Sequence, residues 1–338
     1  MSKLKNKDNL AKEIELIEKM VAGDQLSLAR LISVVERESS DTPELMRQVY
    51  PNIGKAFSIG ITGPPGAGKS SLVDRLTSII RSKGITVGIV AVDPTSPFSG
   101  GAVLGDRIRM QQHYLDEGVF IRSMATRGSL GGLPKTTRDV MKLFDAFGKD
   151  VILVETVGVG QTELDILEAV DSVVVVLVPE SGDTIQTMKA GLLEIANVFS
   201  VNKADRPGAD QLVVELENML HQGPKKEGWQ VPVIPTQAIN DIGTSELWEA
   251  IAAHRGMLEE TGQLDTKRRH RRRTELIETV QQRIVGRLWS LVQGDDEFSH
   301  HLDSVDRGEI DPYSAYINIL NDQKLLETWL AKLSEATS

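Results

Sequence analysis

A glycine-rich segment between an apolar run and an amphipathic stretch constrains the fold of this chain more than any other feature. The segment, residues 60–76, reads GITGPPGAGKSSLVDRL. Gly63, Gly68, Lys69 and Ser70 satisfy the pattern G-x-x-x-x-G-K-[ST]. The preceding run AFSIGIT predicts a strand and the following SSLVDRLTSIIRS predicts a helix, which is the context of a phosphate-binding loop. An ordinary turn between strand and helix would leave the lysine and the serine unexplained.

Elementary chemistry explains why these residue types bind a polyphosphate. Glycines let backbone N–H groups curve around phosphate oxygens without a clash from Cβ atoms. The N-terminus of the following helix adds free N–H donors and a favourable dipole. Lys69 can neutralise charge between the last two phosphates, and the Ser70 hydroxyl can hold Mg²⁺. We therefore predict nucleotide contacts from the whole loop, namely Gly63, Pro64, Pro65, Gly66, Ala67, Gly68, Lys69, Ser70 and Ser71.

From about residue 56, short apolar runs alternate with stretches of helical periodicity. The runs read AFSIGIT, TVGIVAVD, VFIRSM, VILVET, SVVVVLVP, VFSVNKAD and VPVIPTQA. This alternation predicts an α/β fold, a P-loop NTPase whose mostly parallel central sheet has helices on both faces. Helical patterns precede and follow it. We predict an N-terminal helical region at 1–50, a P-loop domain at 51–255 and a C-terminal helical region at 256–338, which closes with a last helical segment at 312–334.

Composition argues against several classes of function. Hydrophobic residues make up 40% of the chain and charged residues 25%, as in a soluble globular protein. A net charge of −10 and an aromatic content of 4% argue against general nucleic-acid binding. Because there is no cysteine, disulfides and thiolate metal sites are excluded. The longest apolar run is too short to span a membrane, and the first twenty residues lack the apolar core of a secretory signal, so we expect a cytoplasmic protein.

A second motif, N-K-x-D, indicates which base the site binds. It consists of Asn202, Lys203 and Asp205, directly after the run VFSV. Guanine offers N1–H and a 2-amino group to a carboxylate and adenine has neither donor, so Asp205 would select guanine. Asn202 can brace the neighbouring loops and approach guanine N7, and the Lys203 stem can lie over the base. A short loop after the next apolar run can reach the guanine carbonyl; its residues are Gln237, Ala238 and Ile239.

Acidic residues near strand ends are candidates for metal binding and, with Lys69, for catalysis. Glu155 ends one apolar run and Gly158 follows three residues later, where many GTPases have D-x-x-G. The Glu155 carboxylate can act on Mg²⁺ directly or through water, and the Gly158 N–H can reach a γ-phosphate. Asp93 ends another run, and Asp106 lies in a loop rich in glycine, serine and proline. A metal on a nucleotide leaves coordination positions for such oxygens, although a helix cap is the alternative role for Asp106.

Four further residues are candidates for switching. Arg107 and Arg109 could stabilise transition-state charge as an internal arginine finger does, with surface salt bridges as the alternative. Gln161 could orient a water molecule, but it lies three residues beyond Gly158 rather than directly after it. Lys189 could sense the active site, and a solvated helix lysine is its alternative.

Five segments together carry a resemblance to a known family. They are GPPGAGKSSL, VDPTSPFSGGAVLGDRIRM, ATRGSLGGL, ETVGVGQTE and NKAD. In this combination the chain resembles the MeaB/ArgK/MMAA-type GTPases, P-loop proteins of the SIMIBI class that act as chaperones for adenosylcobalamin-dependent methylmalonyl-CoA mutase. The resemblance is dense over about residues 56–250, and the flanking helices agree in layout. One local departure is PTQAIND, where relatives often carry a Ser-Ala type loop.

The resemblance implies GTP and GDP as ligands and a Mg²⁺ ion surrounded by Ser70, Asp93, Asp106 and Glu155. It also implies a homodimer held largely through C-terminal helices, and mobile switch segments around 93–109, 155–163 and 180–190. In the family, GTP binding and hydrolysis gate cofactor loading onto the mutase and protect or rescue it. We expect slow intrinsic hydrolysis that the mutase accelerates. Which acyl-CoA mutase is served stays open, with isobutyryl-CoA mutase as one alternative.

Three other functions remain alternatives. Relatives were described as kinases of amino-acid transport binding proteins, but N-K-x-D favours guanine over ATP. A nickel-delivery GTPase would need cysteine or histidine clusters, and this chain has only one adjacent histidine pair, His300 and His301. The run KRRHRRR, residues 267–273, could bind nucleic acid or a membrane surface. A solvated helix start, or a contact with an acidic partner, explains such a charge run more simply.

Overall fold

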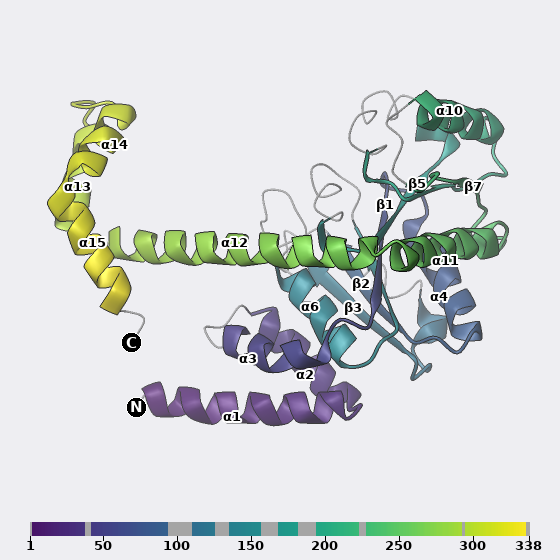
Figure 1. Ribbon diagram of the computed structural model, residues 1–338, viewed down its shortest axis with the longest axis horizontal. Helices are drawn as coiled ribbons and strands as arrows, with labels where there is room; N and C mark the ends of the chain where they lie inside the picture. Colours follow the sequence, from purple (N-terminus) through teal and green to yellow (C-terminus); the bar gives the residue numbers. More distant parts are fainter. Residues whose placement is uncertain are drawn as a thin grey trace. The chain divides into compact units, whose positions relative to one another are not determined.

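The structure, a computed structural model, describes residues 2–37, 42–93, 110–125, 135–156, 168–181, 194–222, 228–292 and 295–335. The chain divides into two compact units, residues 1–267 and 268–338. The three-part division predicted from the sequence stays a prediction. In the first unit, strands lie between two groups of helices (Figure 1).

Seven strands form one sheet in the order β3-β2-β4-β1-β5-β6-β7. Every neighbouring pair is parallel, which confirms the predicted fold class. The strands are rich in valine and isoleucine because helices cover both faces and leave no solvated side. Their bounds are β1 Phe57–Thr62, β2 Val87–Asp93, β3 Val119–Ala125, β4 Val151–Glu155, β5 Ser172–Leu177, β6 Val198–Val201 and β7 Val233–Pro235.

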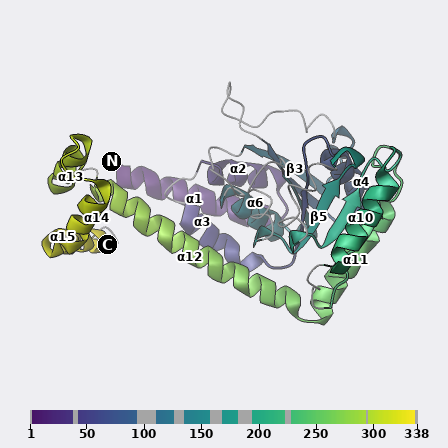
Figure 2. The same cartoon turned by 90° about the horizontal axis from the view of Figure 1, so that it is seen from above.

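Each face of the sheet has its own core. Ile59 and Ile61 of β1 pack on one side, and Val90 and Val92 of β2 pack on the other, as the two-residue period of a strand requires. The first core is covered by α4 (Lys69–Ser82) and α11 (Thr244–Glu260). The second is shared by α1 (Ser2–Val21), α2 (Gln25–Val35), α3 (Thr42–Val49), α6 (Lys135–Ala146) and α10 (Ala209–Gln222). A view from above separates α4 and α11 from α2, α3 and α6 (Figure 2).

The topology places the predicted motifs at one edge of the sheet. β1 is central, between β4 and β5, and its register sets Ile61 beside Glu155 and Thr62 beside Val175. The glycine-rich loop leaves β1 at this carboxyl edge, and the N-K-x-D segment leaves β6 at the same edge. Ligands of open parallel sheets bind outside the carboxyl ends of the strands. The fold therefore brings together motifs that lie more than a hundred residues apart in the sequence.

The second unit is helical. α12 (Gln263–Val292) begins in the first unit and continues into the second, followed by α13 (Asp296–Asp306), α14 (Pro312–Asn321) and α15 (Gln323–Glu335). A small core surrounds Leu325 and Trp329. The Phe298 ring meets the Trp289 and Trp329 rings edge-on, at centroid distances of 6.5 and 6.0 Å.

One sequence expectation in the second unit is corrected. The sequence predicts a single helical segment over 312–334, but the structure divides it into α14 and α15 at Asp322. Asp322 leaves the helical conformation with ψ at 89°, and its Oδ1 accepts a hydrogen bond from the Leu325 N–H at 2.9 Å. An aspartate in this role caps the following helix and so ends the previous one. None of the helices that the structure describes is both long enough and apolar enough to cross a membrane.

Candidate functional site

The glycine-rich loop connects β1 to α4 through backbone conformations that require glycine. Gly63 has φ of +141°, and a Cβ there would lie 2.0 Å from the Val176 carbonyl oxygen of the neighbouring strand. Gly68 has φ of +88°, and a Cβ there would lie 2.4 Å from the Asn202 amide nitrogen. Both conformations are strained for residues with side chains. The loop therefore fits tightly against β5 and against the N-K-x-D segment.

Lys69 starts α4 and folds back into the loop. Its buried Nζ donates to the carbonyl oxygens of Gly63 at 2.8 Å and of Pro64 at 3.1 Å. The ammonium therefore sits inside the curve of the loop at the N-terminus of a helix. There the helix dipole and the lysine charge both favour an anion. This is the environment that a nucleotide polyphosphate needs.

Ser70 and Glu155 form a buried pair next to the loop. Ser70 Oγ donates to Glu155 Oε1 at 2.7 Å, and both side chains are buried. Hydroxyl and carboxylate oxygens are the ligands that Mg²⁺ prefers, so these two residues fit a magnesium ion. Asp93 ends β2, a direct neighbour of β4, with Ala91 opposite Glu155; the side chain of Asp93 lies outside what the structure describes. Asp106 lies outside the described residues as well.

Asn202 links the phosphate loop to the loop after β7. Its Nδ2 donates to the Ala67 carbonyl oxygen at 2.8 Å. Its Oδ1 accepts from the Ala238 N–H at 3.1 Å and from the Thr236 hydroxyl at 3.3 Å. Thr236 in turn shares a 2.8 Å hydrogen bond with the Ser200 hydroxyl of β6. One buried amide therefore fixes the spacing between the two loops.

The rest of N-K-x-D forms a short turn. Lys203 has φ of +58°, the left-handed conformation, and the Ala204 N–H donates to the Thr236 carbonyl oxygen at 3.0 Å. This turn leaves the Asp205 carboxylate exposed, while the next residue, Arg206, pairs with Glu180. An exposed carboxylate beside a braced loop is free to accept two hydrogen bonds from a guanine edge.

The loop after β7 carries the remaining predicted base contacts. The Gln237 N–H donates to the Ile242 carbonyl oxygen at 2.9 Å, which closes the loop. Ala238 is buried, whereas Ile239 is 79% exposed. Packing of the Ile239 side chain therefore contributes little to the position of this loop.

Two interactions near the site were not predicted from the sequence. The Thr156 hydroxyl donates to the Thr62 hydroxyl at 3.0 Å, which joins the residue after Glu155 to the residue before Gly63. Arg75 of α4 donates to carbonyl oxygens of the loop after β7. Thr156 lies within the segment ETVGVGQTE but was not singled out there, and Arg75 lies outside the five segments. Each interaction connects segments far apart in the sequence. Several predicted residues lie outside the described residues: Asp106, Arg107, Arg109, Gly158, Gln161 and Lys189.

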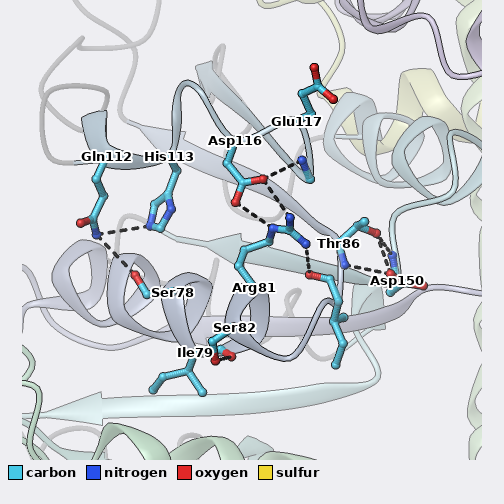
Figure 3. A network of polar contacts seen from close by, with 12 residues as sticks. Ser78, Ile79, Arg81, Ser82, Thr86, Gln112, His113, Asp116, Glu117 and Asp150 are labelled. Carbon is cyan, nitrogen blue, oxygen red and sulfur yellow. Dashed lines mark hydrogen bonds and ion pairs between the residues drawn. The ribbon is translucent and has the colours of Figure 1, made fainter.

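The C-terminal half of α4 is anchored away from the site (Figure 3). Arg81 donates through Nε and Nη2 to the two carboxylate oxygens of Asp116, each at 2.9 Å, and these bonds hold the pKa of Asp116 below its usual value. Nearby, Lys149 donates to the Gly118 carbonyl oxygen at 3.0 Å. Burial, with the Arg81 charge, lowers the pKa of Lys149 to about 8, against the opposing effect of Asp116 and Asp150.

Comparisons with known proteins agree with this geometry. A protein of Pyrococcus abyssi that is provisionally named a GTPase is 51% identical over 311 residues, which cover 91% of this chain and 96% of that protein. The GTPase ArgK of Escherichia coli is 31% identical, covering 90% of this chain and 94% of its own length. A crystal structure described as an LAO/AO transport system kinase superposes with a TM-score of 0.70 at 26% identity, and covers 91% of this chain and 96% of that one.

The relatives are named as GTPases, and the loop, the buried lysine and the N-K-x-D turn match that activity: the chain binds guanine nucleotide and hydrolyses GTP. A family model described as methylmalonyl-CoA mutase-associated GTPase MeaB matches residues 28–293. That match covers most of the chain, including the sheet, the site and all of α12. The chain belongs to the MeaB family of methylmalonyl-CoA mutase-associated GTPases.

Proposed function

We propose that this GTPase is a chaperone of an adenosylcobalamin-dependent acyl-CoA mutase, with methylmalonyl-CoA mutase as the first candidate. GTP binding and hydrolysis would gate cofactor loading onto the mutase and protect or reactivate it. The observation that carries the proposal is the match of residues 28–293 to a family defined by its association with that mutase. A cytoplasmic location and the absence of nucleic-acid and membrane partners stay predictions.

The residues around the phosphate loop have separate roles in the proposed reaction. Lys69 would stabilise the charge that develops on the transferred phosphoryl group, since its ammonium is held inside the loop. Ser70 and Glu155, with Asp93 and Asp106, would hold Mg²⁺. When bound, that ion neutralises charge on the phosphate oxygens. The Gly158 N–H would contact the γ-phosphate, and Arg107, Arg109, Gln161 and Lys189 are candidates for positioning charge and water.

The proposed control works through the predicted switch segments at 93–109, 155–163 and 180–190. Each includes or follows the carboxyl end of a strand, next to the loop that would bind the phosphates. The second begins at the buried Ser70–Glu155 pair and the Thr156–Thr62 hydroxyl bond, which ties its first residues to the phosphate loop. A γ-phosphate can hold such segments in one arrangement, and hydrolysis releases them. This role requires the GTP-bound state to persist and does not require rapid turnover, so we expect a slow intrinsic rate of GTP hydrolysis.

We propose a homodimer formed through the C-terminal helices. On α12, Leu276, Ile277, Val280 and Ile284 recur at helical spacing, and each is between 46% and 64% exposed. An apolar helix stripe of this kind favours packing against a second copy. Val280→Glu should shift the molecular mass measured by light scattering from two chains to one. A wild-type protein of one chain would contradict the dimer.

The proposed function is tested by cofactor loading. Purified apo-mutase is mixed with adenosylcobalamin and this chain, in the presence of GTP or GDP, and holo-mutase formation is followed by visible absorbance. The nucleotide should change the rate or extent of loading, and Lys69→Ala should remove the difference. Identical loading with GTP, with GDP and without the chain would contradict the proposal.

A second candidate is favoured by the name of one solved structure. The protein that superposes with a TM-score of 0.70 is described as a transport system kinase. A kinase would transfer the γ-phosphoryl group to an amino-acid transport binding protein instead of to water. Incubation with γ-labelled GTP and such a binding protein distinguishes the two, because a kinase produces labelled protein and the proposed GTPase releases labelled phosphate.

A further inference from the structure

Arg75 connects the phosphate-loop helix to the predicted base loop. It lies six residues after Lys69 on α4. Its Nε donates to the Ala238 carbonyl oxygen at 3.1 Å and its Nη2 donates to the Ile239 carbonyl oxygen at 3.3 Å. The planar guanidinium presents fixed parallel donors, so it can hold two consecutive carbonyl groups at once. A lysine at this position could not reproduce that fork.

Ala238 is thereby held on both sides of its backbone. Its N–H donates to Asn202 Oδ1 at 3.1 Å, and Asn202 Nδ2 donates to the Ala67 carbonyl oxygen at 2.8 Å. Its carbonyl oxygen accepts from Arg75. One anchor reaches the phosphate loop and the other reaches the helix that this loop begins. The position of the base loop is therefore set relative to the phosphate site.

α4 is a firm support for this interaction. Asp116 holds Arg81 (Figure 3). In addition, Gln112 Nε2 donates to Asp74 Oδ2 at 2.7 Å. Asp74, Ser78 and Arg81 recur at helical spacing, so a single face of α4 is fixed against the segment that precedes β3. Because the helix is fixed, the Arg75 guanidinium is presented to the base loop from a constant position.

The two residues of the loop that Arg75 contacts differ in their support. The Ala238 side chain is buried in the core beside α4 and α11, whereas the Ile239 side chain is largely exposed, so side-chain packing contributes little at Ile239 and the Arg75 hydrogen bond holds its carbonyl. We propose that Arg75 is a positioning residue that sets affinity for the guanine base, by holding the backbone of the base loop at a fixed distance from the phosphate loop. Preorganisation of this kind lowers the ordering cost of binding. The inference rests on the assignment of 237–239 as the base loop.

The test compares Arg75→Ala with the wild type by calorimetry, using GDP and inorganic pyrophosphate, both with magnesium. Loss of two hydrogen bonds to backbone carbonyls should weaken GDP binding about tenfold. Pyrophosphate affinity should stay unchanged, since the phosphate loop is left intact. In steady state, the KM for GTP should rise while kcat at saturating GTP is retained. The GDP affinity of Arg75→Lys should lie between that of the wild type and that of Arg75→Ala, because an ammonium can reach only one of the two carbonyl oxygens.

Two controls make the outcome decisive. Arg47→Ala removes an exposed arginine of α3 that pairs with Glu44 on its own helix, and it should leave both affinities unchanged. Asp205→Asn tests the base site itself. If Asp205→Asn weakens GDP binding and Arg75→Ala does not, the role of Arg75 is overturned while the base site stands. If Arg75→Ala weakens the binding of GDP and of pyrophosphate equally, Arg75 supports the structure of the whole site and the proposed role in base affinity is overturned. If Asp205→Asn has no effect on GDP binding, the base-loop assignment and the inference fail together.

Discussion

Asn202 Nδ2 donates to the Ala67 carbonyl oxygen at 2.8 Å, which joins the N-K-x-D segment to the phosphate loop across 135 positions of sequence. The same amide accepts the Ala238 N–H. The base and phosphate sides of the nucleotide site are therefore parts of one hydrogen-bonded unit. Recognition of the base and of the phosphates can be tested separately by substitutions that leave this unit intact.

Asp205→Asn should change which base is bound. The carboxylate accepts N1–H and the 2-amino group of guanine, whereas an asparagine amide can donate to the 2-oxo group of xanthine. GDP binding should weaken by about a hundredfold while xanthosine diphosphate binding is gained. Calorimetry with the two nucleotides measures both changes. Asp210→Asn, at an exposed carboxylate in the first turn of α10, is the matched control and should bind GDP as the wild type does. An unchanged preference for GDP in Asp205→Asn would refute the base assignment.

Lys69→Ala should abolish nucleotide binding. The substitution removes the buried ammonium that lies against the Gly63 and Pro64 carbonyl oxygens, and with it the charge that offsets the phosphates. Lys83→Ala, at the other end of α4, removes an exposed lysine and should bind GTP as the wild type does. Unchanged GTP affinity of Lys69→Ala in calorimetry would rule out the phosphate-loop assignment.

Glu155→Gln should raise the magnesium requirement of GTP hydrolysis. The buried carboxylate accepts from the Ser70 hydroxyl at 2.7 Å, and a neutral amide oxygen is a weaker ligand for a hard cation. The magnesium concentration for half-maximal hydrolysis should rise at least about tenfold. Glu117→Gln, an exposed glutamate at the opposite edge of the sheet, serves as the control. A magnesium titration identical to that of the wild type would remove Glu155 from the metal set.

Lys149 should give stability a specific dependence on pH. Its folded-state pKa is lowered to about 8 by burial, while in the unfolded chain it stays near 10.4. Between these values the unfolded state binds more protons, so the free energy of unfolding rises with pH. Lys149→Met lacks the titrating ammonium. The free energy of unfolding of the wild type, minus that of Lys149→Met, should therefore increase from pH 8 to pH 10. A relative stability that is constant or falls across that range would contradict the lowered pKa.

Local patterns were enough to predict much of the fold and part of the site. The continuous apolar runs predicted the parallel strands, because strands buried on both faces need no alternation. The pattern from Gly63 to Ser70 predicted a loop that the structure indeed places between β1 and α4. The division of the last helical segment at Asp322 was missed, because an aspartate inside a helical pattern can equally be a helix residue, and only the structure shows its carboxylate capping the next helix.

The contacts that hold the site together were harder to predict. Arg75 and Ala238 are 163 residues apart, and Thr62 and Thr156 are 94 apart. From the sequence, an arginine on an amphipathic helix that will bind a carbonyl group looks the same as an arginine that is only solvated. The difference appears once the fold brings the carbonyl group within hydrogen-bond distance. Such pairings depend on strand order and register, which single residues do not encode.

The proposed control of a mutase by this GTPase is tested most sharply by the rate of GTP hydrolysis with and without purified adenosylcobalamin-dependent methylmalonyl-CoA mutase. The measurement uses saturating GTP, increasing mutase and Lys69→Ala as the blank. We expect a slow rate for the chain alone and a saturable increase as mutase is added. A rate that is already fast, and that the mutase leaves unchanged at every concentration, would contradict the proposed control.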